Sequence, residues 1–165
     1  GIDMTAKFTV LGNTTLATAS SSVTFSSIPG GYKDLVLSYQ VKLVSGGGYF
    51  GFRLNGDSGT NYNTVSMHGN GSTAASYSSP SANFGLTGLT LDSVSYTSGL
   101  LEIADFSATN KHSTCLSREN DSAVGASAAA IRWANTAAVT SLYLAPTSGS
   151  LSWAAGSTFR LLGVN

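Results

Sequence analysis

Apolar side chains recur at every second position along much of this chain, and this period limits what the backbone can form. The clearest case is residues 35–44, where Leu35, Leu37, Tyr39, Val41 and Leu43 make one continuous apolar face. Such alternation lines one face of a β-strand, whereas an amphipathic helix needs a period of about 3.6 residues. The best helical candidate, residues 123–137, is rich in alanine but contains a glycine, and we interpret it as a loop running into a strand. The sequence therefore predicts an all-β chain with almost no helix.

Gly, Asn, Ser and Pro residues separate about ten such segments, a spacing typical of β-sandwiches and jelly rolls. We expect strands at residues 8–11, 23–25, 35–44, 49–54, 64–68, 85–91, 100–106, 113–118, 130–133, 139–144 and 158–164. Residues 35–44 and 49–54 are predicted to form a β-hairpin, and residues 69–81 a long surface loop. Because no βαβ alternation occurs, we predict an antiparallel, jelly-roll-like β-sandwich whose first and last strands pair.

The length of 165 residues fits a single domain with one hydrophobic core. We divide it into an N-terminal segment, residues 1–22, that forms a first strand or an arm, and one β-sandwich domain, residues 23–165. Residues 1–3 precede Met4, which we interpret as the natural start, with the preceding residues a remnant of cloning. We recognise no secretory signal peptide and no apolar run near the roughly 20 residues of a membrane span.

Charged residues are scarce, and their balance argues against nucleic-acid and membrane partners. They make up 10% of the chain, with eight Lys and Arg against eight Asp and Glu. Binding a nucleic-acid duplex needs a basic face, and binding a membrane surface needs a basic amphipathic helix, and the sequence offers neither. A weakly charged surface has little self-repulsion, so we expect the chain to associate with copies of itself.

Residues that bind metals do not cluster in the sequence. His68 and His112 lie in separate segments and Cys115 is the single cysteine, so a zinc site would lack ligands. Cys115 falls in an alternating strand and is predicted to be buried. Asn55 and Asp57 belong to a segment rich in oxygen-bearing side chains, but it lacks the spacing of an EF-hand loop. A tight turn explains these residues, with calcium binding left as the open alternative, and we predict no metal or cofactor.

Side chains suited to catalysis do not form a recognisable arrangement. No GxSxG motif marks a nucleophilic serine. Glu102 and Asp105 lie three residues apart in a predicted strand and would face opposite sides. Glu119 and Asp121 are predicted to lie in a solvated turn. Because these residues fill none of the usual catalytic roles, we predict that the chain is not an enzyme, with a glycan-processing enzyme as the alternative.

Aromatic residues offer another route to ligand binding, since aromatic faces stack on sugars. The residues considered for such a platform are Tyr49, Tyr62, Tyr77, Tyr96, Trp133 and Trp153. Trp133 and Tyr143 lie in apolar strands and are predicted to pack inside. Tyr77 and Trp153 lie in polar surroundings and are predicted to be exposed, and with Tyr62 they form our set of candidate ligand or interface residues.

Four segments stand out by their order along the chain. Residues 23–37 are VTFSSIPGGYKDLVL, residues 52–62 are FRLNGDSGTNY, residues 133–142 are WANTAAVTSL and residues 156–164 are GSTFRLLGV. Together they resemble segments of a group of small virion structural proteins of tailed bacteriophages, especially aquatic ones. The chain departs from that group at Leu162, where an aromatic residue is usual. The resemblance implies a jelly-roll, homotrimeric particle protein and carries over no catalytic residue.

From the resemblance we expect a non-enzymatic bacteriophage virion structural protein. The first expectation is a capsid decoration or cement protein that acts through protein–protein interfaces. Its partners would be copies of itself and phage capsid or tail proteins. The alternative is a tail-fibre or receptor-binding module that recognises a host surface glycan. Either protein would be made in the host cytoplasm and located in the virion.

Overall fold

The alternating segments form twelve β-strands in the structure, which is a computed structural model. It describes residues 7–121 and 125–165, and these contain no helix, so none that could cross a membrane. The proposed start at Met4 lies outside the described residues. The strands are β1 (Phe8–Thr15), β2 (Val23–Phe25), β3 (Asp34–Val41), β4 (Gly48–Leu54), β5 (Tyr62–Gly69), β6 (Ala74–Ala82), β7 (Gly85–Leu91), β8 (Thr97–Ala104), β9 (Ser113–Asp121), β10 (Gly125–Trp133), β11 (Leu142–Thr147) and β12 (Thr158–Val164).

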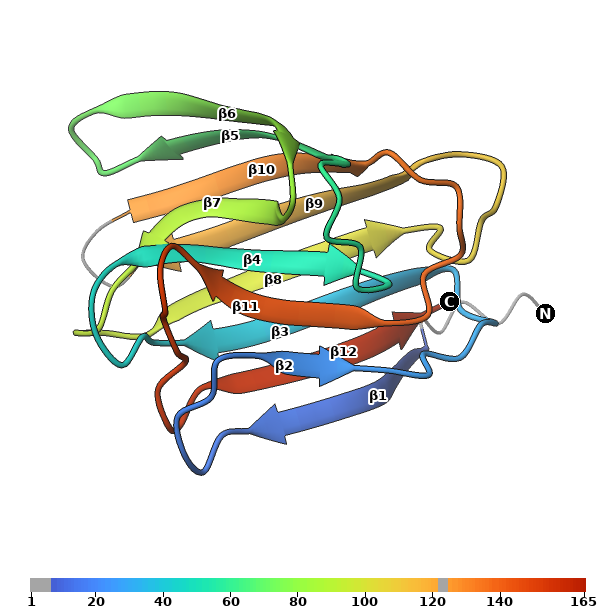
Figure 1. Cartoon of the computed structure of the whole chain (residues 1–165), viewed down its shortest axis with the longest axis horizontal. Coiled ribbons are helices and arrows are strands. Elements are labelled where there is room, and N and C mark those ends of the chain that lie inside the picture. Colours follow the sequence, from blue (N-terminus) through green and yellow to red (C-terminus); the bar gives the residue numbers. More distant parts are fainter. Residues whose placement is uncertain (1–6, 122–124) are drawn as a thin grey trace.

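The strands form two stacked antiparallel sheets (Figure 1). An eight-stranded sheet, here named the back sheet, runs in the order β1-β12-β3-β8-β9-β10-β5-β6. A four-stranded sheet, the front sheet, runs in the order β2-β11-β4-β7 and covers part of it. This arrangement confirms the predicted all-β, antiparallel sandwich. The first and last strands also pair as predicted, with Phe8 of β1 opposite Val164 of β12.

The core lies between the sheets and is built from the inward-facing positions of each strand. In β3 every second residue from Leu35 is buried, as the alternation predicts. The ring of Tyr39 stacks on Phe50 of β4 with centroids 4.0 Å apart, and Trp153 and Phe159 extend the aromatic cluster. Because these rings come from both sheets, their burial holds the two layers together.

The predicted hairpin between residues 35–44 and 49–54 is wrong. Strand β3 pairs with β12 and β8 in the back sheet, whereas β4 pairs with β11 and β7 in the front sheet. The glycine turn between them carries the chain from one layer to the other. Gly48 allows this crossing, because a Cβ there would lie 2.5 Å from the Thr147 carbonyl oxygen. The apolar faces of β3 and β4 therefore meet across the core rather than side by side.

The predicted surface loop at residues 69–81 is also wrong. Strand β6 occupies most of it and forms a hairpin with β5 at the edge of the back sheet. The side chain of Asn70 caps the turn, since its Oδ1 accepts hydrogen bonds from the backbone amides of Ser72 and Thr73. Most residues of β6 are exposed, so this edge strand has no apolar face to reveal it in the sequence.

Candidate functional site

A cleft on the outer side of the front sheet is one candidate site among the described residues. It has a volume of about 590 Å³ and lies beside the end of β11. We name it the front cleft. Its lining residues are Ser21, Asn83, Phe84, Tyr143, Ala145, Pro146, Thr147, Ser148, Gly149, Ser150, Leu151 and Ser152.

Two aromatic rings form one wall of the front cleft. Phe84 and Tyr143 have centroids 6.4 Å apart and planes inclined by 36°. Phe84 lies over β4 because Gly51 has no side chain, and a Cβ at Gly51 would approach the Phe84 ring to 2.9 Å. The guanidinium of Arg53 lies 3.8 Å from the centre of the Phe84 ring, and its Nε donates a hydrogen bond of 2.9 Å to the Asn83 carbonyl. Arg53 therefore fixes the position of Phe84.

Serine residues also line the front cleft. The turn after β11 bends sharply, because Ser148 and Gly149 both adopt positive φ values of 102° and 64°. This bend places Ser148, Ser150 and Ser152 in the lining of the cleft. Within the described residues their hydroxyl groups make no side-chain hydrogen bond, so they are free to donate and accept. The cleft thus combines an aromatic wall of two tilted rings with hydroxyl-bearing residues.

A second groove, of about 580 Å³, crosses the outer face of the back sheet above a buried carboxyl group. Its polar lining includes Gln40, Arg118 and Arg160. Beneath it, the carboxylate oxygen Oε1 of Glu119 accepts hydrogen bonds of 2.5 Å from the hydroxyl groups of Tyr39 and Thr87.

Glu119 and Tyr39 are buried between the sheets, with 5% and 2% of their surfaces exposed. Burial raises the pKa of Glu119, although the hydrogen bonds from Thr87 and Tyr39 act in the opposite direction. Burial also raises the pKa of Tyr39 well above its usual value. Neither group is therefore an exposed base, and the prediction that Glu119 lies in a solvated turn is wrong.

The structure places our three candidate ligand residues in different environments. Tyr62 and Trp153 are buried, and the expectation that Trp153 is exposed is wrong. Trp153 packs against Phe50 and Phe159 in the core. Tyr77 is 45% exposed on β6 and stacks on Tyr49 with ring centroids 6.4 Å apart.

The remaining aromatic residues divide between core and surface. Trp133 is buried as predicted, whereas Tyr143 is only half-buried and lines the front cleft. Tyr96 is 41% exposed, and its hydroxyl donates a hydrogen bond to the Ala155 carbonyl. The sequence analysis did not select Phe84 as a candidate ligand residue. Its position directly before Gly85, at the start of β7, was the one feature that could have indicated it.

Asp57 holds the turn between β4 and β5 by accepting hydrogen bonds from three donors. Its Oδ1 accepts from the Gly59 amide at 2.8 Å, and its Oδ2 accepts from Asn61 Nδ2 at 2.8 Å and from Trp133 Nε1 at 2.6 Å. These hydrogen bonds lower the pKa of Asp57, the one from Trp133 most strongly. Among residues 7–121 and 125–165, no three His, Cys, Asp or Glu side chains gather as metal ligands. Cys115 is buried as predicted, and burial raises the pKa of its thiol to about 12.

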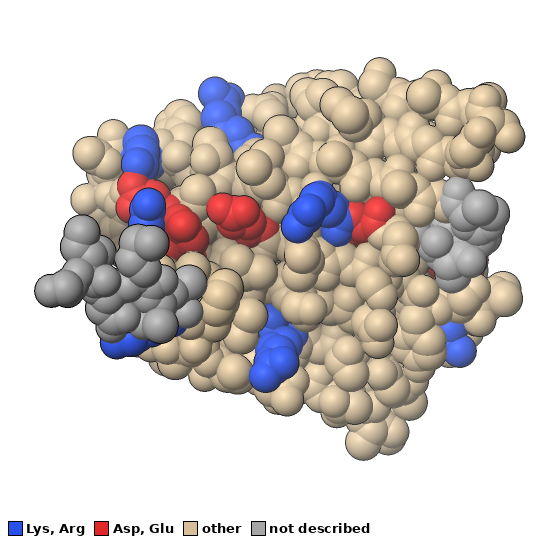
Figure 2. Space-filling view, turned by 180° about the vertical axis from the view of Figure 1, so that it is seen from behind, with Lys and Arg blue, Asp and Glu red and all other residues tan. Residues whose placement is uncertain are grey.

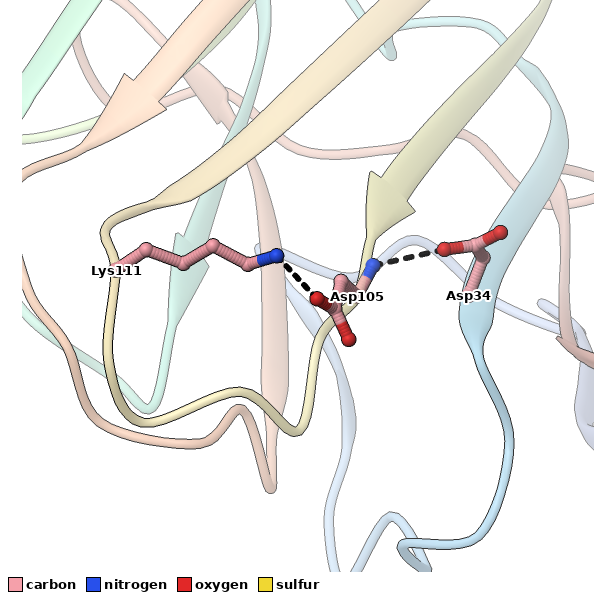
Figure 3. Close-up of polar contacts among 3 residues, drawn as sticks. All are labelled: Asp34, Asp105 and Lys111. Carbon is pink, nitrogen blue, oxygen red and sulfur yellow. Dashed lines mark hydrogen bonds and ion pairs between the residues drawn. The ribbon is translucent and has the colours of Figure 1, made fainter.

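Carboxylates on the back sheet serve local contacts. Glu102 points outward from β8, whereas Asp105 lies in the turn that follows, at a positive φ of 46°. In Figure 3 the amide of Asp105 donates a 2.7 Å hydrogen bond to Asp34 Oδ1, and the Asp105 carboxylate pairs with Lys111. These contacts tie the end of β8 to β3 and to the loop before β9, and they bring no second carboxylate to Glu102.

Comparison with known proteins yields structural neighbours but no family. No protein-family model matches the sequence, and neither does any curated protein. The chain is similar to two mutant forms of the alginate lyase Aly36B. The form in complex with an alginate tetrasaccharide has 15% identity and a TM-score of 0.40, over 97% of this chain and 80% of the lyase. The form with a trisaccharide has 14% identity and a TM-score of 0.37, over 96% and 80%.

Both neighbours are enzymes, and neither is a virion protein. They contradict the expectation that this chain is not an enzyme. They also contradict the expectation of a bacteriophage structural protein, whether a capsid decoration protein or a tail-fibre module. At these values the likeness concerns the β-sandwich fold and transfers no activity or residue to this chain. The resemblance to virion proteins, the phage partners, the homotrimer and the virion location stay predictions from the sequence.

Proposed function

We propose that this chain binds an uncharged saccharide in the front cleft. The observation that carries this proposal is the meeting of two aromatic rings, Phe84 and Tyr143, with serine hydroxyl groups in one cleft. Sugars have apolar C–H faces that stack on aromatic rings, and they have hydroxyl groups that exchange hydrogen bonds with serines. A saccharide therefore matches both kinds of lining residue at once.

The charge and size of the front cleft restrict the class of ligand that it can bind. Its described lining contains no Asp, Glu, Lys or Arg, and the neighbouring Arg53 guanidinium is stacked on Phe84 and hydrogen-bonded to the Asn83 carbonyl, so we expect neutral sugars to bind in preference to a uronate or a sulfated sugar. Its volume of about 590 Å³ lies within the range of roughly 300–1,000 Å³ typical of small-molecule sites. A short segment of neutral sugar units is the ligand class that fits best.

Calorimetric titration with a panel of neutral and acidic oligosaccharides tests this proposal. We expect a neutral member to bind, and we expect Tyr143→Ala to weaken that binding roughly fivefold to tenfold, equivalent to about 1–1.4 kcal/mol for a lost stacking ring. The hydroxyl of Tyr143 makes no hydrogen bond within the described residues, so its removal leaves no buried partner unpaired.

Tyr77→Ala is the matched control, because Tyr77 is an exposed tyrosine that does not line the front cleft. Its affinity for the neutral ligand should equal that of the unaltered protein. If Tyr77→Ala abolishes binding while Tyr143→Ala does not, the site lies on β6 instead. Binding of acidic sugars alone would contradict the proposal and would implicate Arg118 and Arg160 of the back sheet.

A further inference from the structure

Large apolar side chains are exposed on the outer face of the back sheet, away from the front cleft. Met67, Leu116, Val65 and Leu100 are 68%, 61%, 60% and 38% exposed. They line a groove of about 570 Å³ together with the half-buried Val36. We name this surface the back-face strip; its residues are Val36, Val65, Met67, Leu100, Glu102, Leu116, Arg118, Ala128 and Ala130.

The strand register makes the back-face strip continuous. Directly opposite residues of paired strands face the same side of a sheet. One row crosses four strands of the back sheet, through Leu100, Arg118, Ala128 and Met67. A neighbouring row crosses the same strands, through Glu102, Leu116, Ala130 and Val65. The two rows form a single apolar surface that contains one positive and one negative side chain.

Arg118 and Glu102 are the two charges of the back-face strip, and they lie on adjacent strands, one in each row. Neither side chain has an ion-pair partner within residues 7–121 and 125–165. Figure 2 shows charged side chains in a band through the middle of this face, with further Lys or Arg side chains above and below the band. A surface that carries one of each charge is complementary to its own copy turned by a two-fold axis.

We infer that the back-face strip is the interface of a two-fold dimer of this chain, in which Arg118 of each copy pairs with Glu102 of the other copy. A flat patch that covers itself requires a two-fold axis, since a trimer needs two different patches to meet. The two rows of the strip cross four of the eight strands, and the whole outer face of the back sheet offers roughly 900 Å² at the usual strand spacing and rise. A standard interface buries about 800 Å² on each partner, so the dimer must also cover much of the sheet around the strip.

The dimer interface and the front cleft lie on opposite layers of the sandwich. Two copies packed through their back sheets would present both front clefts outward. The dimer therefore does not depend on saccharide binding, and each proposal can fail without the other. The homotrimer predicted from the sequence differs in its number of copies, so the same mass measurement distinguishes the two.

Light scattering on a sizing column tests the dimer. We expect the mass of two copies for the unaltered protein, and we expect Glu102→Arg alone and Arg118→Glu alone to raise the dissociation constant at least tenfold. Each single reversal places like charges opposite each other in the homodimer. Mixing the two variants should restore a dimer of one copy of each, because both cross-interface pairs are then attractive. A pair formed within one copy could not produce this rescue.

Lys33→Glu, an exposed reversal outside the back-face strip, should leave the dimer intact. Circular dichroism confirms that each variant keeps its β-sheet content, and Leu116→Ser replaces any charge variant that does not fold. A monomeric native protein at high micromolar concentration, a mass of three copies, or failure of the mixed variants to pair would each overturn the inference.

Discussion

The carboxyl group of Glu119 lies between the two sheets, where Tyr39, Thr87 and the amide of Leu89 donate hydrogen bonds to it. Burial raises its pKa above the ordinary value of 4.5 that it has in an unfolded chain. A group with a raised pKa contributes its full stability below the unfolded pKa, and that contribution is lost as the pH rises through the folded pKa. Glu119 should therefore weaken the fold as the pH increases from mildly acidic toward neutral.

Replacing Glu119 with Gln tests this residue-scale account, because the amide is close in size but cannot ionise. We expect the stability of Glu119→Gln relative to that of the native protein, measured as the difference in their free energies of unfolding, to increase as the pH rises. Denaturant unfolding of both proteins at several pH values in this range gives the difference in their free energies of unfolding. The contributions of ionisable groups that both proteins share cancel in this difference. A difference that does not change with pH, or one that moves the other way, would show that Glu119 is not held at a raised pKa.

Strand β8 has a glycine, Gly99, at the point where the side chain of Tyr39 needs space. Gly99 lies between Tyr39 of β3 and Glu119 of β9 in the register of the back sheet. The Tyr39 side chain passes beneath Gly99 to reach the Glu119 carboxyl group. The strand order β3-β8-β9 is thus tied together by a hydrogen bond that crosses the middle strand.

Gly99→Ala should destabilise the protein by about 1–3 kcal/mol, the usual cost of overpacking a core. The added Cβ would lie 2.3 Å from the ring and hydroxyl oxygen of Tyr39, so one of them must move. Gly30→Ala is the control, because a Cβ there meets nothing within 4 Å, and its effect should stay within about 0.5 kcal/mol. Urea denaturation compares the two. Equal stability of both variants would contradict the packing described for Tyr39.

The sequence predicted most strands but not how they are distributed between the sheets. Alternation reports which side of a strand is buried, and this is local information. It does not distinguish a hairpin from a crossing between layers, so the pairing of β3 with β4 was predicted wrongly. The burial of Glu119 was not predicted, because the sequence analysis ended this predicted strand at Arg118. Its parity matches that of the buried Cys115, so alternation continued along β9 would have placed it inside.

At the scale of the whole molecule, the two outer faces of the sandwich differ in chemistry. The front sheet carries an aromatic and hydroxyl-lined cleft, and the back sheet carries an apolar strip with one charge of each sign. The sequence indicated that aromatic residues could bind sugars, but not which ones. Exposure depends on the turn after β11 and on the space left by Gly51, both of which need the folded chain. Trp153, in polar surroundings by sequence, fills the core instead.

The central claim is that the ligand surface of this protein is the front cleft. Two-dimensional amide NMR during titration with the neutral oligosaccharides locates the ligand residue by residue. We expect the largest shifts at Phe84, Tyr143 and residues 148–152, with the back-face strip unaffected. Shifts centred on Arg118 and Arg160, or no shifts with any neutral saccharide, would contradict the claim.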